Sequence, residues 1–339
     1  MSTTLQQDIK HFVETAPFVN ELRGKHILVT GATGLIGSTL IRCLLELNVD
    51  IHIVASIRNR SKMEHLFGEL CRQIQIIECN LEEYDFSSLP QINYIIHCAA
   101  PTASSFFVNY PVETVHSIFG ITDRLLQYAR THSIEGMIYL SSLEVYGSGL
   151  DDKIITEDMQ GYWDTQDVRS SYPIAKRAAE NLCHLYAKEY GIPVKIARLT
   201  QTTGAGINKD DNRVINQFAR LASNQQDIVL HSTGESARPY CYTIDCITAL
   251  LYILFKGENG EAYNVANNST YISAREMGEY IRDHFANDIK VIFDIKDNMG
   301  YAPVSKLNLS TAKLENLGWK PQYNIHDIIE RLINYYNEI

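Results

Sequence analysis

A tyrosine and a lysine stand four residues apart in the segment Tyr172-Pro-Ile-Ala-Lys176. In a helix, this spacing puts both side chains on one face. A nearby cation lowers the pKa of a phenol, and the phenolate can then remove a proton from a substrate hydroxyl. We therefore expect Tyr172 to act as a general base, with the ammonium of Lys176 beside it.

Two serines, Ser141 and Ser142, follow the apolar run that begins at Met137. At the carboxyl end of a strand, a hydroxyl can hydrogen-bond to a reacting oxygen. The pattern predicts a catalytic triad of Ser142, Tyr172 and Lys176. The alternative is that the serine only caps a helix, while the tyrosine and lysine form a surface pair.

Three glycines, Gly31, Gly34 and Gly37, lie between an apolar run and a helical pattern in the sequence G-A-T-G-L-I-G. The first permits a tight turn, the second lets the backbone approach a pyrophosphate, and the third lets helix and strand pack closely. The helix N-terminus adds N–H donors and positive potential. This motif predicts a dinucleotide site; the alternative is a purely structural turn.

The second apolar run, Ile51–Ile57, bears on the choice of dinucleotide. An acidic residue that would bind an NAD ribose is missing from its end, and Asp50 stands at the wrong end. Ser56, Arg58 and Arg60 suit the 2′-phosphate of NADP instead, because guanidinium groups match phosphate geometry. The alternative is that these arginines are merely solvated, so the residues alone leave the cofactor open.

The elements that must position these groups alternate along the first 200 residues. Short β-branched runs are separated by segments of helical period. This order predicts an α/β fold, a doubly wound parallel (Rossmann) sheet covered on both faces. The expected strands are His26–Thr30, Ile51–Ile57, Ile74–Glu78, Tyr94–Cys98, Met137–Ser141 and Val194–Leu199, and the expected helices Ser38–Leu47, Ser61–Arg72, Pro111–Thr131 and Tyr172–Tyr190.

The pattern changes after Thr203, where an irregular polar stretch begins. We expect a smaller α/β substrate domain, interleaved with the first and closing over the carboxyl ends of the strands. The dinucleotide domain then comprises 1–203 plus about 240–267, and the substrate domain about 204–239 plus 268–339. The expected elements are helices Val214–Ser223, Ile244–Phe255 and Ile325–Tyr336 and strands Asp227–His231 and Ala262–Val265.

Composition excludes several classes of partner. The 339 residues carry 30 Lys+Arg against 40 Asp+Glu, a net charge of −10, which disfavours binding to nucleic acid or an anionic membrane. No apolar run reaches the length of a membrane span, and the N-terminus lacks a secretory signal. The seven cysteines contain no CxxC pair, so we expect reduced thiols, no metal site and a cytoplasmic protein.

Taken together, these residues resemble the extended short-chain dehydrogenase/reductase family, in particular its nucleotide-sugar epimerases, dehydratases and decarboxylases. The resemblance covers nearly the whole chain. Its marks are G-A-T-G-L-I-G, H-C-A-A at 97–100, S-S-L-E-V-Y-G at 141–147, Y-P-I-A-K, N-V-A-N at 264–267 and L-G-W-K-P at 317–321.

The resemblance implies a nicotinamide cofactor, with tightly held NAD favoured over NADP, and a nucleoside-diphosphate sugar as substrate. It places the turn 200–203 against the nicotinamide and substrate. The residues assigned to the cofactor are Gly31, Thr33, Gly34, Leu35, Ile36, Gly37, Ser56, Arg58, Asn80, Leu81, Ala99, Ala100, Tyr172 and Lys176. Those assigned to the substrate are Pro101, Thr102, Ser142, Gln201, Arg213 and Arg238.

The reaction depends on Leu143 and Glu144. Dehydratases of this family put an acid or a serine where Leu143 stands, and leucine cannot protonate a departing hydroxyl. Glu144 matches a family glutamate, and the segments 169–183 and 211–218 look most like decarboxylases. A UDP-glucuronate decarboxylase-like reaction is therefore expected, with Ser142, Glu144, Tyr172 and Lys176 as catalytic residues. At Gln201 the family usually has asparagine.

Other functions stay open. A 4,6-dehydratase or 4-epimerase shares the first oxidation at C4, and an NADPH-dependent ketosugar reductase would use Arg58. A non-enzymatic dinucleotide sensor would be expected to lose the Tyr172–Lys176 pair, which is intact. The helices 111–131 and 172–190 carry apolar residues on more than one face, and family members pair through these helices. We therefore expect a homodimer.

Overall fold

A seven-stranded parallel sheet forms the centre of the computed structural model, which describes residues 1–151, 153–295 and 304–339. The strand order is β11-β7-β5-β4-β1-β2-β3, and every neighbouring pair is parallel. The predicted doubly wound α/β fold is confirmed. The strands are β1 (Lys25–Thr30), β2 (Ile51–Ile57), β3 (Ile74–Glu78), β4 (Tyr94–His97), β5 (Gly136–Ser142), β7 (Val194–Leu199) and β11 (Ala262–Val265).

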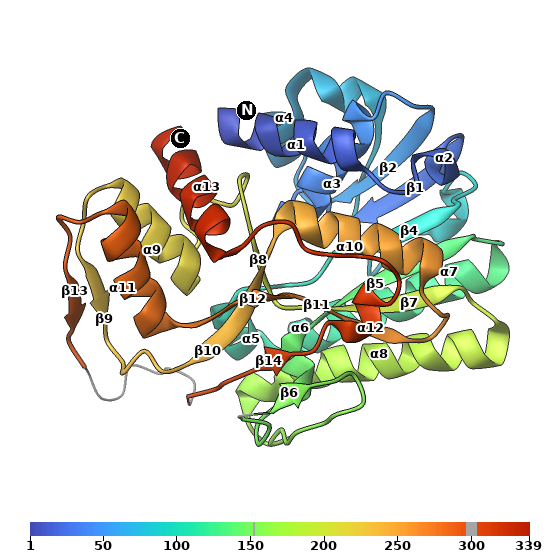
Figure 1. Cartoon of the computed structure of the whole chain (residues 1–339). Helices are drawn as coiled ribbons and strands as arrows, with labels where there is room; N and C mark the ends of the chain where they lie inside the picture. The colour runs from blue at the N-terminus through green and yellow to red at the C-terminus, as the bar shows by residue number, and fades with distance from the viewer. Residues whose placement is uncertain (152, 296–303) are drawn as a thin grey trace.

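Both faces of the sheet are covered, which explains why its central strands are mostly apolar and buried. In β5, Met137 and Tyr139 pack into one hydrophobic cluster and Ile138 and Leu140 into another. Figure 1 shows α8 running along one face while α10 crosses the other. The covering helices are α3 (Leu35–Glu46), α4 (Arg60–Phe67), α7 (Ile121–Thr131), α8 (Ser171–Tyr190) and α10 (Thr243–Lys256).

A second group of elements gathers at one end of the sheet, on the side of Figure 1 away from β2. It includes the sheet β12-β10-β8, in which β10 is parallel to β8 and antiparallel to β12, and the two-stranded pairs β13-β9 and β14-β6. Whether it is a separate substrate domain stays a prediction. Its strands are β6 (Ile154–Ile155), β8 (Gln201–Thr203), β9 (Ile228–Leu230), β10 (Ala237–Tyr242), β12 (Asn267–Ser273), β13 (Val291–Phe293) and β14 (Asn308–Leu309). Its helices are α9 (Val214–Ser223), α11 (Ala274–Phe285) and α13 (Ile325–Asn337), whereas α12 (Ala312–Glu315) packs on β11 and α10 of the large sheet.

Two predicted helices are interrupted. The segment 61–72 leaves the α-helix at Gly68, whose φ of +52° favours glycine, and continues as the 3₁₀ turn η1 (Gly68–Gln73). The segment 111–131 is α6 (Pro111–Val115), then the π-helical turn η3 (His116–Gly120), then α7. The further short elements are α2 (Val19–Leu22), η2 (Phe86–Ser88), α5 (Ser104–Asn109), η4 (Leu143–Tyr146) and η5 (Val168–Ser170).

The N-terminal helix α1 (Thr3–Thr15) was not predicted, because the segment is mostly polar. Its apolar residues Leu5, Ile9 and Phe12 are spaced as one helix face and are buried. Figure 1 shows α1 beside α13. The two helices are joined by an ion pair of 2.6 Å between Asp8 Oδ1 and Arg331 Nη1.

All seven cysteines are free in the structure, and four of them, Cys43, Cys183, Cys241 and Cys246, are buried. Within the described ranges, no helix combines the length and the apolarity that crossing a bilayer requires.

Candidate functional site

The glycine turn lies between β1 and α3, as predicted. Gly31 has a φ of +65°, and a Cβ there would lie 2.8 Å from the backbone nitrogen of Ala99. A Cβ on Gly37 would lie 2.5 Å from the carbonyl oxygen of Gly31. Both positions therefore require glycine because the turn, β4 and α3 approach each other closely.

Gly34 differs from these two glycines. It precedes α3 without a side-chain cap, and a Cβ there would come no closer than 3.3 Å to another protein atom. The protein alone therefore tolerates a side chain at Gly34 better than at Gly31. Because Gly34 has no side chain, the space in front of the N-terminus of α3 stays open, and we call this space the cradle. The first N–H groups of the helix point into it and have no partner within the helix. A dinucleotide pyrophosphate fits this cradle, with the backbone of Leu35, Ile36 and Gly37 in the first turn.

The ends of β2 and β3 flank this turn. The side chain of Ser56 is buried. The backbone carbonyl oxygen of Ser56 accepts a hydrogen bond from Ala32 N at 3.4 Å. Arg58 and Asn80 are exposed, whereas the side chain of Leu81 lies in the hydrophobic core. The structure thus leaves Arg58 and Asn80 accessible at the sheet edge, and a contact through Leu81 would have to use its backbone.

Arg58 provides a test of cofactor choice. If its guanidinium held a 2′-phosphate, NADP would bind more tightly than NAD, and Arg58→Ala would remove the preference. We expect the opposite: NAD binds more tightly, and Arg58→Ala changes its Kd less than about threefold, because an exposed side chain contributes little. Titration of apo-protein with both dinucleotides measures this. A strong NADP preference that Arg58→Ala abolishes would contradict it.

A buried histidine fixes the end of β4. His97 Nδ1 lies 2.7 Å from Thr30 Oγ1, and Nε2 lies 3.2 Å from Thr122 Oγ1. Burial lowers the pKa of His97 to about 3, so the ring is neutral and has a structural role. Thr30 Oγ1 also accepts a hydrogen bond from Ala99 N at 3.1 Å. This network holds Ala99, and with it Ala100, next to Gly31.

Tyr172 and Lys176 lie in the first half of α8, and both are buried. The ring of Tyr172 stacks on Phe107, with centroids 4.2 Å apart and planes 14° apart. The ammonium of Lys176 donates a hydrogen bond of 2.6 Å to the carbonyl oxygen of Leu140 and lies 5.9 Å from the Tyr172 ring centroid. Burial lowers the pKa of Lys176 to about 8.

The prediction that the pKa of Tyr172 is lowered toward neutrality is wrong for this structure, in which the pKa is raised. Burial raises the pKa, and the negative charge of Glu144 raises it further. The Ser142 hydroxyl and the Arg169 guanidinium act in the opposite direction. The physical reason is that the phenol is enclosed by protein, where the anion loses its hydration.

Ser142 and Glu144 lie at the junction of β5 and η4. The hydroxyl of Ser142 accepts a hydrogen bond from Glu144 N at 3.2 Å, so it caps this turn as well as facing Tyr172. The carboxylate of Glu144 forms an ion pair of 2.8 Å with Arg169 Nη2. Leu143 is 4% exposed and packs in an apolar cluster with residues that include Ile155.

Three of the predicted substrate residues, Gln201, Arg213 and Arg238, come from separate elements but lie near the same tyrosine, Tyr240. Gln201 in β8 pairs with Tyr240 in β10, and the two strands run on in parallel from there. Burial raises the pKa of Tyr240 to about 12, while the charges of Arg238 and Arg213 oppose this rise. Both arginines therefore lie near the same buried phenol. Pro101 and Thr102 lie in the connection from β4 to α5.

Arg213 already has an anionic partner inside the protein. Its Nε lies 3.0 Å from Asp211 Oδ1, and its Nη1 donates to the carbonyl oxygen of Thr202 at 3.0 Å. The prediction that Arg213 pairs with a substrate anion is therefore untested, and such an anion would have to share the arginine with Asp211.

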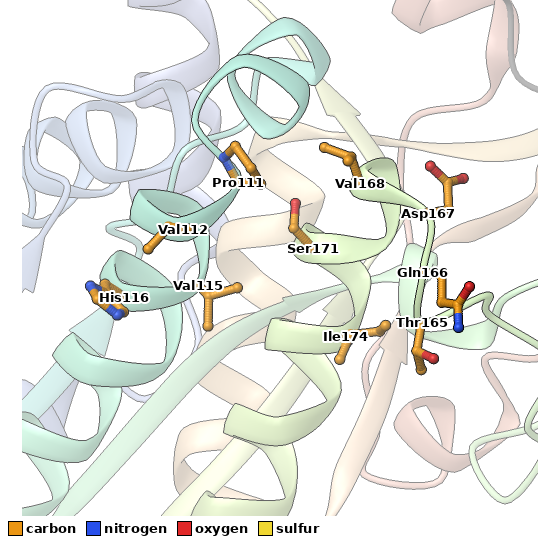
Figure 2. Close-up of a pocket in the computed structure, with 10 residues that line it drawn as sticks. All are labelled: Pro111, Val112, Val115, His116, Thr165, Gln166, Asp167, Val168, Ser171 and Ile174. Carbon is orange, nitrogen blue, oxygen red and sulfur yellow. The ribbon is translucent and has the colours of Figure 1, made fainter.

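A hollow of about 470 Å³ lies beside the triad but is not lined by it. Figure 2 shows α6 on one side of the hollow, and η5 and the first turn of α8 with Ser171 on the other. Its residues are Pro111, Val112, Val115, His116, Thr165, Gln166, Asp167, Val168, Ser171 and Ile174.

Three residues near the triad were not singled out from the sequence: Phe107, Trp163 and Arg169. Phe107 stacks on Tyr172, Arg169 pairs with Glu144, and Trp163 Nε1 donates to the Glu144 carbonyl oxygen at 2.9 Å. Arg169 precedes Tyr172 by three residues, so its place before the helix was a usable signal. Trp163 comes from the loop before η5, and only Phe107 comes from a distant segment.

The family model described as "NAD dependent epimerase/dehydratase family" matches residues 27–266. UDP-glucuronic acid decarboxylase 6 of Arabidopsis thaliana is 27% identical over 307 residues, which cover 89% of this chain and 85% of that protein. The dTDP-D-glucose 4,6-dehydratase of Bos taurus is also 27% identical, over 93% of this chain and 89% of that protein.

Solved structures resemble the whole fold. UDP-glucuronic acid 4-epimerase from Bacillus cereus, in complex with UDP-glucuronic acid and NAD, superposes with a TM-score of 0.79 and 23% identity. The match covers 92% of this chain and 98% of the epimerase. At this identity the likeness shows the fold.

Proposed function

The chain belongs to the NAD dependent epimerase/dehydratase family, and on that premise we propose that it decarboxylates a nucleoside-diphosphate sugar acid of the UDP-glucuronate type. NAD is the cofactor of the family, and when bound it supplies a hydride acceptor that can later return the hydride. Tyr172 takes the proton of the C4 hydroxyl, and Ser142 hydrogen-bonds to the same oxygen. Lys176, fixed on Leu140, holds positive charge beside Tyr172.

The resulting C4 ketone makes the second step possible. The C5 carboxylate leaves as carbon dioxide, and its electron pair passes into the enolate conjugated with the ketone. Protonation at C5 restores the ketone; solvent supplies this proton, and the Glu144 carboxylate relays it to C5 directly or through a water. The C4 oxygen then regains its proton from Tyr172 as the hydride returns.

One observation carries the choice of decarboxylation over dehydration. Loss of water from C5 and C6 needs an acid to protonate the departing hydroxyl. Leu143 stands where an acid would serve, and its side chain is buried in an apolar cluster. Decarboxylation makes no such demand, since carbon dioxide leaves without a proton. The similarity to decarboxylases and dehydratases is equal at 27% and does not separate them.

Product masses test this proposal. We expect the purified protein to convert UDP-glucuronate to a product lighter by carbon dioxide, and to remove no water from UDP-glucose or dTDP-glucose. Glu144→Gln is expected to lower decarboxylation about 10²–10⁴-fold, the usual range for an acid–base group. NAD binding should persist, because Glu144 lies away from the glycine turn. A 4-keto-6-deoxy product from a hexose nucleotide would overturn the proposal and assign both proton transfers of a dehydration to Glu144.

We also propose that two copies of the chain pair through α6, η3 and α8. Val112 and Val115 in α6, Phe119 in η3 and Leu185 in α8 are 61%, 38%, 37% and 48% exposed. Val112 and Val115 line the hollow of Figure 2, and Val115 and Phe119 line a second hollow next to it. Contiguous exposed apolar surface supports a protein interface, and two-fold pairing is the commonest form.

Light scattering tests the pairing. We expect twice the chain mass of 38.5 kDa at micromolar concentration. Val112→Asp should give the single-chain mass, because the interface would bury an unpaired charge. The matched control is Ile154→Asp, at a residue 63% exposed in β6, and it should stay dimeric. A parent protein of single-chain mass would refute the pairing.

A further inference from the structure

The ion pair between Glu144 and Arg169 joins η4 to η5 beside the triad. Arg169 Nη2 and Glu144 Oε2 are 2.8 Å apart, and the two side chains are 28% and 30% exposed. Arg169 Nη1 is buried without a hydrogen-bond partner among the described residues. Glu144 therefore supplies the negative charge that compensates a partly buried guanidinium.

Arg169 is anchored by the same ring that packs on Tyr172. Its guanidinium lies 5.0 Å from the centroid of the Phe107 ring, which stacks on Tyr172 at 4.2 Å. Ser171 Oγ donates to the Phe107 carbonyl oxygen at 3.2 Å, tying α5 to the start of α8. The arginine and the phenol are thus placed relative to each other by one aromatic side chain.

Glu144 is fixed through its backbone as well. Its N–H donates to Ser142 Oγ, and its carbonyl oxygen accepts from Trp163 Nε1. These bonds hold the main chain but leave the side-chain torsions free. The bond to Arg169 restricts the carboxylate, and a fork-shaped guanidinium suits this restriction better than a single ammonium.

We propose that Arg169 is a positioning residue, which holds the Glu144 carboxylate on the substrate side of Tyr172 and balances its negative charge there. The proposal rests on the proposed function for the roles of Tyr172 and Glu144, and adds a residue to which no role has been given. Arg169 acts through Glu144 and does not touch the reacting atoms.

The charges that face Tyr172 determine in which direction each substitution should shift the pH dependence of the rate. Glu144 from η4 disfavours the phenolate, and Arg169 from η5 favours it. Lys176 of the same helix lies 5.9 Å from the ring, and Tyr139 of β5 is buried nearby. Removing Arg169 leaves Glu144 uncompensated, so a rate that requires the phenolate needs a higher pH. Removing the charge of Glu144 has the opposite effect.

The experiment compares Arg169→Gln and Glu144→Gln in the NAD-loaded protein, with the nucleotide sugar that the product assay identifies. We expect Arg169→Gln to lower kcat about tenfold to 10²-fold with little change in KM, because the carboxylate is misplaced while the groups that bind the substrate remain. The rising limb of the pH–kcat/KM profile should move up by about one pH unit. In Glu144→Gln the limb should move down.

Two variants separate positioning from a structural role. Arg169→Lys should recover part of kcat and of the pH shift, since an ammonium can still pair with Glu144. Lys313→Gln is the matched control, because it breaks another ion pair of 2.8 Å, between Lys313 and Glu261, whose side chains are 34% and 35% exposed. This variant should keep the parent kcat and the parent pH profile. An Arg169→Gln protein with the parent pH profile and kcat, even if it melts at a lower temperature, would overturn the proposal.

Crystal structures of the variants test the positioning role of Arg169 independently of the proposed decarboxylase activity. In Arg169→Gln the Glu144 carboxylate should leave its place beside Tyr172, and in Arg169→Lys it should stay. This readout needs no turnover. If no sugar acid is decarboxylated, the proposed function fails; if Glu144 keeps its place without Arg169, the positioning role fails.

Discussion

Turnover should fall about 10²–10⁴-fold when Tyr172 is replaced by phenylalanine, the range expected for loss of a general base. The substitution removes only the phenolic oxygen. The ring, which is 7% exposed and stacks on Phe107, can keep its packing. We therefore expect the melting temperature and the affinity for NAD to stay close to those of the parent, while the rate falls.

Tyr128→Phe is the matched control. Tyr128 is also a buried helical tyrosine, 3% exposed, and its hydroxyl donates to the Pro90 carbonyl oxygen at 3.3 Å, away from the triad. This variant should retain the parent rate. If Tyr172→Phe turns over within a few-fold of the parent, Tyr172 is not the base, whatever reaction the protein performs.

Substitutions in the glycine turn should have the second large effect, on stability at Gly31 and on NAD affinity at Gly34. Gly31→Ala should lower the free energy of unfolding by about 2–5 kcal/mol, because it combines a positive φ with a Cβ 2.8 Å from the backbone of Ala99. Gly34→Ala should fold, since its nearest contact is 3.3 Å. A methyl group in the cradle should cost NAD about 1–3 kcal/mol, which is about 5–150-fold in Kd.

Denaturant melts and NAD titrations of the two variants measure this contrast. Gly120→Ala is the control, because a Cβ there meets no atom within 4 Å, and it should bind NAD as the parent does. A Gly34→Ala protein with the parent affinity would show that the dinucleotide does not approach the turn at this glycine.

The sheet could be predicted from the sequence because the residue pattern that marks each strand lies within the strand itself. The runs Ile51–Ile57, Ile74–Glu78 and Val194–Leu199 are strands over those residues, since each is short, rich in β-branched residues and followed by a segment of another pattern. Helix α1 was missed although Leu5, Ile9 and Phe12 follow helical spacing, because polar residues outnumber them in the segment. Its three buried apolar residues find their partners in α3 and α13, and no local pattern shows such contacts.

The candidate site also has parts that local sequence patterns predict and parts that they do not. The glycines could be placed because the turn is contiguous in sequence, and the positions of Ser142 and Tyr172 follow from a strand end and a helix start. The pKa of Tyr172 was predicted in the wrong direction, because burial outweighs the charge of a neighbour and is not visible in a short motif. Arg169 was passed over because its partner, Glu144, lies on a separate element.

The contact between α1 and α13 has a consequence for synthesis of the protein. Asp8 leaves the ribosome 323 residues before Arg331, its ion-pair partner. At about 5–20 residues per second, the wait is roughly 15–65 s. During this time α1 can already pack on α3, but the residues that meet α13, Asp8 among them, lack their final partner. Release of α13 from the exit tunnel is therefore the event that lets this corner of the molecule close.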